Sequence, residues 1–101
     1  MVIIHIKLLP IVYNEIKESK NWYNQKRQGL GEDFKSAVNH KIEDIAHYSY
    51  HFQIKFSSVR AAFLNRFPYG IFFIIEQEKK QIVILGVMHT KRDPKTIYKR
   101  R

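Results

Sequence analysis

The chain has 101 residues and no cysteine, and its 18 Lys and Arg against 9 Asp and Glu give a formal net charge of +9 with neutral histidines. This length predicts a single domain over residues 1–101, and a hydrophobic content of 45% excludes a wholly disordered chain. The absence of cysteine excludes disulfide bonds and thiolate metal sites. No apolar run reaches the ~18 residues that span a bilayer, and the N-terminus lacks the features of a secretory signal. We therefore expect a soluble, cytoplasmic, basic domain with no membrane partner.

The first half of the chain predicts a strand followed by two helices. Residues 2–8 form a β-branched and aliphatic run that is typical of a strand. Apolar residues then recur at helical spacing over residues 10–27 and again over about 30–47, on either side of the turn at residues 29–31. Two helices joined by a short glycine loop predict an antiparallel hairpin, and their apolar faces require a sheet to pack on.

The second half predicts the sheet. Residues 54–57 form a short strand or a bridge, and residues 59–67, 71–75 and 82–88 form an antiparallel meander of strands. The central runs lack clean alternation of apolar and polar residues, so we expect both faces of the sheet to be partly covered. The predicted fold class is α+β with the order β-α-α-β-β-β, an antiparallel (mixed) sheet that carries an N-terminal helical hairpin.

The positive charge is concentrated in the second half. Residues 1–50 carry seven Lys and Arg against six Asp and Glu, whereas residues 51–101 carry eleven against three, a net +8. Such a field attracts nucleic acid or an acidic protein segment, although a solvated surface is the simpler interpretation. The densest part is the C-terminus, where Asp93 alone opposes a group of six cations: Lys91, Arg92, Lys95, Lys99, Arg100 and Arg101.

Arg60 and Arg66 form the first candidate for function. The period of two along the strand 59–67 places both on one face, ~20 Å apart. They cannot hold one phosphate together at that distance, but they could follow a long nucleic-acid backbone. The alternative is that each arginine pairs with a carboxylate or with the C-terminus and closes the fold.

The residues after the last strand form the second candidate. His89, Arg92 and Tyr98 lie there beside Lys91 and Lys95. A base that takes the 2′-hydroxyl proton and cations that stabilise the phosphate would perform ribonuclease chemistry. The alternative is a structural His89 that hydrogen-bonds the chain as it leaves the strand.

Aromatic residues of the first helix and the other histidines give weaker signals. Tyr13, Trp22 and Tyr23 are interpreted as the packing face of the helix, with a stacking platform for bases as the alternative. The remaining histidines show no pairing at metal spacing with a third ligand, and the glycines do not form a phosphate-binding loop. We assign no metal and no cofactor.

A series of short motifs in a fixed order covers nearly the whole chain: "WY…GLG…F" at residues 22–34, "VR…L.RFPY.I" at 59–71 and "V.H..R.P" at 87–94. This series resembles the RelE/ParE toxin superfamily, and most closely the ParE-type toxins of plasmid stabilisation. The resemblance implies a toxin that is encoded beside an antitoxin, whose extended or helical segment wraps and neutralises it. It also implies the fold predicted above.

The resemblance further implies a choice of target. Ribonuclease-type members cut messenger RNA in the ribosome with a cluster of cations and a Tyr or His near the C-terminus, whereas ParE-type members are described as poisons of DNA gyrase. By position in the motifs, the matching residues here are Arg60, Arg66, His89, Arg92 and Tyr98. The nuclease cluster is incomplete, because Gly86 and Val87 stand where the last strand would carry a cation and Lys55 is the only lysine near the start of the sheet.

We therefore hypothesise a growth-arresting toxin that acts by contact with a large target such as DNA gyrase and is neutralised by a cognate antitoxin. The first alternative is a ribosome-dependent mRNA endonuclease with His89, Arg92 and Tyr98 as catalytic residues. The second alternative is a degenerate, non-toxic member that still binds an antitoxin. The residues expected to contact the target or a nucleic acid are Arg60, Arg66, Lys91, Lys95 and Arg100.

Overall fold

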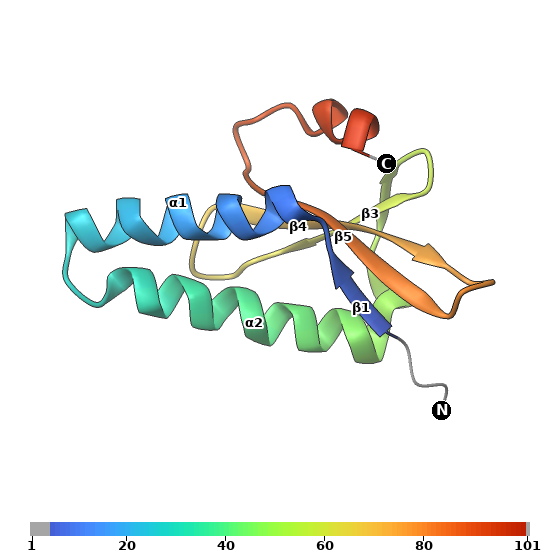
Figure 1. Ribbon diagram of the computed structural model, residues 1–101, viewed down its shortest axis with the longest axis horizontal. Coiled ribbons are helices and arrows are strands. Elements are labelled where there is room, and N and C mark those ends of the chain that lie inside the picture. Colours follow the sequence, from blue (N-terminus) through green and yellow to red (C-terminus); the bar gives the residue numbers. More distant parts are fainter. Residues whose placement is uncertain (1–4, 101) are drawn as a thin grey trace.

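The computed structural model describes residues 5–100, apart from the side chain of Tyr98. Residues 2–4 of the predicted first strand and Arg101 of the basic C-terminus lie outside the described residues. Figure 1 shows a sheet with a long helical hairpin on one face and a short C-terminal helix on the other. The elements in chain order are β1 (His5–Leu8), α1 (Pro10–Lys26), α2 (Leu30–Tyr48), the 3-10 helix η1 (Ser49–His51), β2 (Ile54–Phe56), β3 (Val59–Phe63), β4 (Tyr69–Glu76), β5 (Gln81–His89) and the 3-10 helix η2 (Pro94–Arg100).

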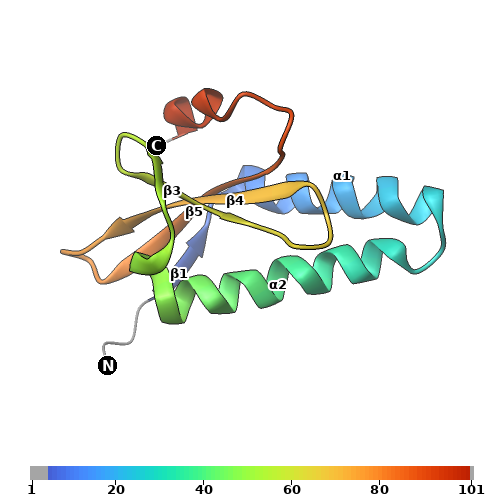
Figure 2. The same ribbon diagram turned by 180° about the vertical axis from the view of Figure 1, so that it is seen from behind.

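The sheet is mixed, as predicted. Its strand order is β1-β5-β4-β3-β2, with β1 parallel to β5 and all other neighbours antiparallel. The predicted α+β class and meander are confirmed, and the segment left open as strand or bridge forms β2 at the sheet edge. Seen from behind, the β4–β5 turn and the α1–α2 loop lie at opposite ends of the molecule (Figure 2).

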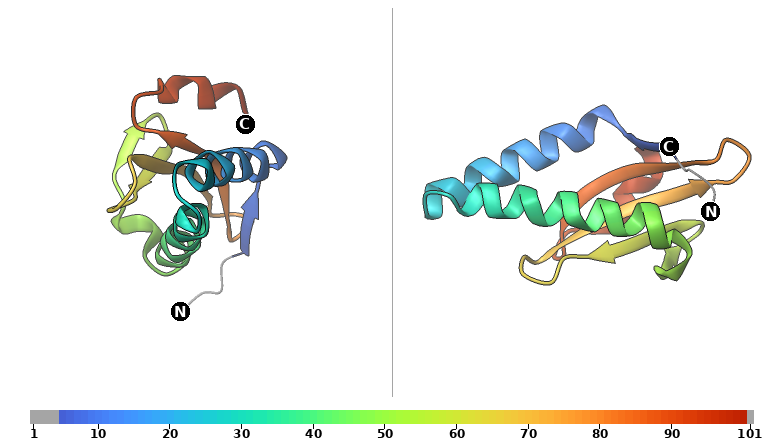
Figure 3. Two further views of the ribbon diagram at one scale, coloured as in Figure 1. Left: turned by 90° about the vertical axis from the view of Figure 1, so that its left-hand side faces the viewer. Right: turned by 90° about the horizontal axis from the view of Figure 1, so that it is seen from below.

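The helices form where the sequence predicts them. Pro10 opens α1, where its fixed φ suits the first turn, and Glu32 and Asp33 lie in the first turn of α2, where they oppose the positive end of the helix dipole. The side-chain Oδ1 of Asn24 accepts a hydrogen bond from the N–H of Gly31 at 2.7 Å and so fixes the turn between the helices. Figure 3 shows the two helices side by side and antiparallel. No helix of the described part of the chain has the length and apolar character needed to cross a membrane.

Both faces of the sheet are covered, as the lack of alternation predicted. The hairpin side is closed by a cluster of aromatic and aliphatic residues that includes Tyr23, Phe34 and Phe67. On the opposite side, Ile97 of η2 is fully buried against Leu85 and the rest of a second cluster. Strands β4 and β5 therefore bury apolar side chains on both faces, which explains their almost continuous apolar sequence.

A β-bulge interrupts β5. Phe72 of β4 is paired with Gly86, but the next residue, Phe73, is paired with Ile84, so Leu85 is the additional residue. The pairing of β5 with β1 also ends at Ile84. Beyond this point no strand within residues 5–100 lies along one edge of β5, and the backbone groups of this edge need other hydrogen-bond partners.

Candidate functional site

His89 lies at the end of β5, where the sheet places it opposite Tyr69. Their ring centroids are 5.3 Å apart, with an interplanar angle of 71°. The backbone N–H of Lys91 donates a hydrogen bond to His89 Nδ1 at 3.1 Å. A neutral imidazole whose Nδ1 accepts carries its proton on Nε2. In this arrangement the remaining nitrogen of His89 donates a hydrogen bond, whereas a general base would have to accept a proton there.

A cleft of about 420 Å³ opens beside His89. Trp22 lies at the cleft with half of its surface exposed, and its ring meets the ring of the buried Tyr23 edge-on at 5.0 Å. The Nζ atom of Lys26 lies 4.8 Å from the centroid of the Trp22 ring. We call this feature the aromatic cleft, and its lining residues are Glu18, Ser19, Trp22, Tyr23, Pro68, Tyr69 and His89.

The interpretation of the three aromatic residues of α1 as one packing face is correct for Tyr23 and wrong for the other two. Tyr23 is 8% exposed, whereas Trp22 is 51% and Tyr13 is 61% exposed. Successive residues of a helix are rotated by about 100°. Val12 and Tyr23 are separated by eleven positions, almost a whole number of turns, and both point into the core. Tyr13 directly follows Val12 and Trp22 directly precedes Tyr23. Both are therefore rotated away from the side of the helix that faces the core.

Arg60 is held inside the fold. Its Nη1 donates to the carbonyl oxygens of Phe52 at 2.7 Å and Tyr50 at 3.4 Å, and its guanidinium carbon lies 5.2 Å from the centroid of the Tyr50 ring. These contacts join β3 to the segment that connects α2 with β2. The partners are backbone carbonyls and an aromatic ring, where the sequence analysis had considered a carboxylate.

The predicted strand over residues 59–67 is too long, and Arg66 does not lie on it. β3 ends at Phe63, so Arg60 and Arg66 have no common strand face and cannot follow a backbone along it. Arg66 instead forms an ion pair with Asp33 of α2 at 3.4 Å, and its guanidinium carbon lies 5.2 Å from the ring of Phe67. The N–H of Leu64 still bonds the carbonyl of Tyr69, in register with the β3–β4 pairing, and the chain turns towards β4 after this pair.

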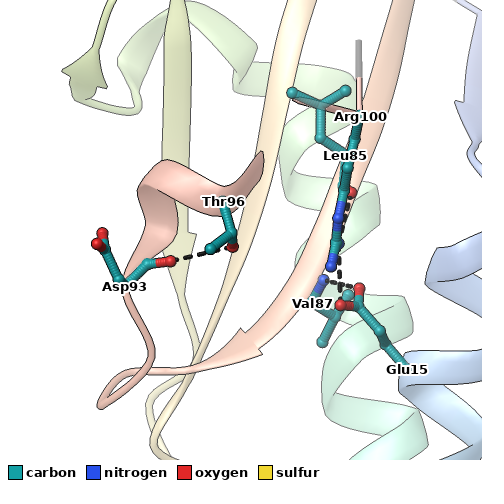
Figure 4. A network of polar contacts seen from close by, with 6 residues as sticks. All are labelled: Glu15, Leu85, Val87, Asp93, Thr96 and Arg100. Atoms are coloured by element: carbon teal, nitrogen blue, oxygen red, sulfur yellow. Dashed lines mark hydrogen bonds and ion pairs between the residues drawn. The ribbon is translucent and has the colours of Figure 1, made fainter. Parts of the chain in front are cut away.

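Arg100, predicted as an exposed contact residue, is almost buried, with only 13% of its side chain exposed. Its Nη1 donates to the carbonyl oxygen of Leu85 at 3.1 Å and lies 2.9 Å from Oε2 of Glu15 in an ion pair. The other carboxylate oxygen, Glu15 Oε1, accepts a hydrogen bond from the N–H of Val87 at 2.9 Å. Figure 4 shows Glu15 of α1 and Arg100 of η2 meeting at the free edge of β5. We call these four residues the Glu15–Arg100 clamp.

Of the other basic candidates, Lys91 and Arg92 lie on the turn after β5 and Lys95 lies in η2. Lys91, Arg92 and Lys95 are exposed, and no acidic side chain within residues 5–100 pairs with any of them. Asp93 starts η2, because its Oδ1 accepts the N–H of Lys95 and its carbonyl accepts the Thr96 hydroxyl. Tyr98 lies in η2, but its side chain is outside the described part of the structure.

The structure thus brings His89 together with residues that the sequence analysis had not assigned to a site. Glu18, Ser19, Pro68 and Tyr69 line the aromatic cleft with it. In the sequence, Glu18 and Ser19 precede Trp22 and Tyr23 by four residues. This spacing is a signal that could have placed Glu18, Ser19 and the two aromatic residues on one side of the helix. In residues 5–100, no three His, Asp or Glu side chains are grouped in a way that could hold a metal ion.

The pKa of Tyr23 gives a first prediction. Burial raises this pKa above the ordinary value of 10.0, and the neighbouring Tyr69 adds to the rise. The folded chain favours the neutral phenol, so the stability that Tyr23 contributes is complete below about pH 10 and is lost as the pH rises through the folded pKa. We expect Tyr23→Phe to lose less stability than the wild type between about pH 9 and pH 11.5, measured by denaturant unfolding. Parallel losses in the two proteins would contradict this.

No protein-family model and no curated protein sequence matches the chain, but solved structures do. A chain of the chromosomal ParDE toxin–antitoxin system of P. aeruginosa matches with a TM-score of 0.76 and 13% identity, over 86% of this chain and 96% of that one. A mutant of E. coli toxin RelE in the free state matches with a TM-score of 0.69 and 10% identity, over 98% and 94%. The RelBE2 toxin–antitoxin complex of Mycobacterium tuberculosis gives 0.60 and 14%, over 88% and 93%. The coverage is nearly complete and the identity low, so these comparisons show a shared fold.

Proposed function

We propose that this chain, which has the fold of the RelE and ParE toxins, is the toxin of a type II toxin–antitoxin system. Two observations support this proposal: the series of motifs in the sequence, and the fold. Structures of a ParDE system and of a RelBE2 complex are among the matches. We infer from them that an antitoxin encoded beside this chain binds and neutralises it.

We further propose that the toxin acts by contact with a large target such as DNA gyrase. The observation that carries this proposal is the engagement of three arginines within the fold. Arg60 bonds backbone carbonyls, Arg66 pairs with Asp33, and Arg100 pairs with Glu15. Arg60 and Arg100 are held by partly buried groups and are not free to stabilise a phosphate beside His89, whereas the ion pair of Arg66 lies at the surface, with 61% of the Arg66 side chain exposed. The Nε2 proton of His89 does not suit a base.

Expression in cells tests this proposal. We expect growth arrest on induction, relief of the arrest by co-expression of the adjacent reading frame, gyrase-dependent DNA breaks and intact messenger RNA. A double variant with His89→Asn and Arg92→Gln is expected to arrest growth as the wild type does, because these residues then have no proton to transfer and no phosphate to stabilise.

Other outcomes would contradict the proposal in distinguishable ways. Codon-phased cuts in messenger RNA that disappear in the double variant would establish the ribosome-dependent endonuclease, with His89 and Arg92 as catalytic residues. Normal growth after induction, with the folded protein present in the cells, would establish a degenerate, non-toxic protein. Circular dichroism of the purified variant provides the folding control.

A further inference from the structure

We propose that the aromatic cleft anchors one apolar side chain from an acidic segment of the antitoxin. This inference rests on the proposed function, since it assigns a place on this chain to the partner. Trp22 is the only tryptophan of the chain and is 51% exposed. Tryptophan is the residue type most often found to dominate binding energy at protein interfaces, and there it lies next to a well-packed pocket.

The walls of the cleft suit an apolar side chain. Tyr23 is buried and Tyr69 is half-buried, and their ring centroids are 6.1 Å apart. Phe34 and Phe67 pack behind Tyr23 at 5.3 Å and 4.9 Å, so this wall is rigid. A volume of about 420 Å³ lies within the usual range of ligand sites, about 300–1,000 Å³. A leucine or a phenylalanine of a partner would find a preformed pocket and would order few groups on binding.

The polar groups of the cleft match a peptide backbone. His89 offers the Nε2 proton, because its Nδ1 is occupied by the N–H of Lys91. Glu18, which also lines the cleft, offers carboxylate oxygens. A peptide carries one acceptor and one donor per residue, so a carbonyl of the segment can accept from His89 while an N–H donates to Glu18.

The charges around the cleft select an acidic segment. Lys26 lies beside Trp22, and the exposed Lys91 and Arg92 follow His89 in the chain. None of the three forms an ion pair with another described residue. Acidic residues on both sides of the apolar anchor would be complementary to them. A nucleic acid would instead bring its phosphates towards Glu18, so we argue for a peptide segment.

Variants of the cleft test this inference with the purified chain and the product of the adjacent reading frame. Ser19→Arg fills the cleft and Trp22→Ala removes its wall. We expect each to weaken the complex at least about thirty-fold, the loss typical of an interface hot spot. Tyr13→Ala is the matched control, since Tyr13 is an exposed aromatic residue of the same helix outside the cleft. We expect it to bind within about three-fold of the wild type.

Two further measurements make the test specific. Fluorescence of the wild-type chain reports on Trp22 alone, and we expect a blue shift when a tryptophan-free partner binds, because the ring leaves water. The affinity is expected to fall as salt rises from about 50 mM to 500 mM, since the charge pairs are screened.

The outcomes separate this inference from the proposed function. If the partner relieves growth arrest but binds both cleft variants as tightly as the wild type, the cleft is not the anchor site. The proposed toxin function would stand. An affinity that does not change with salt would overturn the proposal that the segment is acidic. A chain that neither arrests growth nor binds the adjacent product would contradict the proposed function itself and with it the partner assigned here.

Discussion

Glu15→Ala is expected to lower the free energy of unfolding by about 3 kcal/mol, which is the cost of leaving a nearly buried charge without its partner. Only 11% of the Glu15 side chain is exposed. Its removal leaves Arg100 without its ion-pair partner and the N–H of Val87 without an acceptor. Chemical denaturation at neutral pH measures the change.

A double-mutant cycle identifies the Glu15–Arg100 clamp as the cause. Arg100→Ala should destabilise by a similar amount, and the double variant should cost less than the sum of the two. The matched control is Lys20→Ala, which breaks the more exposed ion pair of Lys20 with Glu32 at 3.6 Å and should change stability by at most about 0.5 kcal/mol. A Glu15→Ala variant as stable as the control would show that the clamp contributes nothing.

The clamp also explains the glycine in β5. A Cβ atom at Gly86 would lie 2.8 Å from Nη1 of Arg100 and 3.0 Å from Cδ1 of Ile97. In the sequence alone, Gly86 is a last-strand position that lacks a cation. In the structure the guanidinium of Arg100 lies over this position, brought there by η2, and the missing side chain provides the space. Gly86, Arg100 and the bulge at Leu85 therefore form one unit that holds η2 on the sheet.

The local pattern of apolar and polar residues was sufficient to predict the elements of the fold. The helical spacing of apolar residues locates α1 and α2 to within two residues, because each helix buries one continuous stripe. The strand predicted over residues 59–67 was wrong at its C-terminal end. Leu64 and Phe67 are both buried, so the apolar pattern continues past Phe63, where β3 ends.

The site could be predicted only in part, because its residues meet through tertiary contacts. His89 was a candidate from its position after the last strand, but the cleft joins it to α1 and to the β3–β4 turn, some seventy and twenty residues away in the sequence. The arginines show the same limit. Their partners are backbone carbonyls, an acid of α2 and an acid of α1, and no spacing in the sequence distinguishes these arginines from free ones such as Arg92.

Gly31→Ala is expected to destabilise the protein by about 3 kcal/mol, the upper part of the range for overpacking. A Cβ atom at this position would lie 2.2 Å from the carbonyl oxygen of Lys20 and 2.6 Å from Cγ of Asn24. Backbone lies in the way on one side, so α1 and α2 must separate. The higher helix propensity of alanine, about 1 kcal/mol, offsets only part of this cost. Thermal and denaturant unfolding measure the difference.

Gly29→Ala serves as the control for the same loop. Gly29 has φ of +90° and nothing within 4 Å of its missing Cβ, so alanine there meets only the strain of a left-handed backbone, about 1–2 kcal/mol. A larger loss at Gly31 than at Gly29 would assign the effect to the close approach of the helices, and the reverse order would contradict it. Tyr23 and Trp22 lie on the α1 turn between Lys20 and Asn24. Separation of the helices at Gly31 should therefore also widen the aromatic cleft and move the fluorescence of Trp22 towards the red.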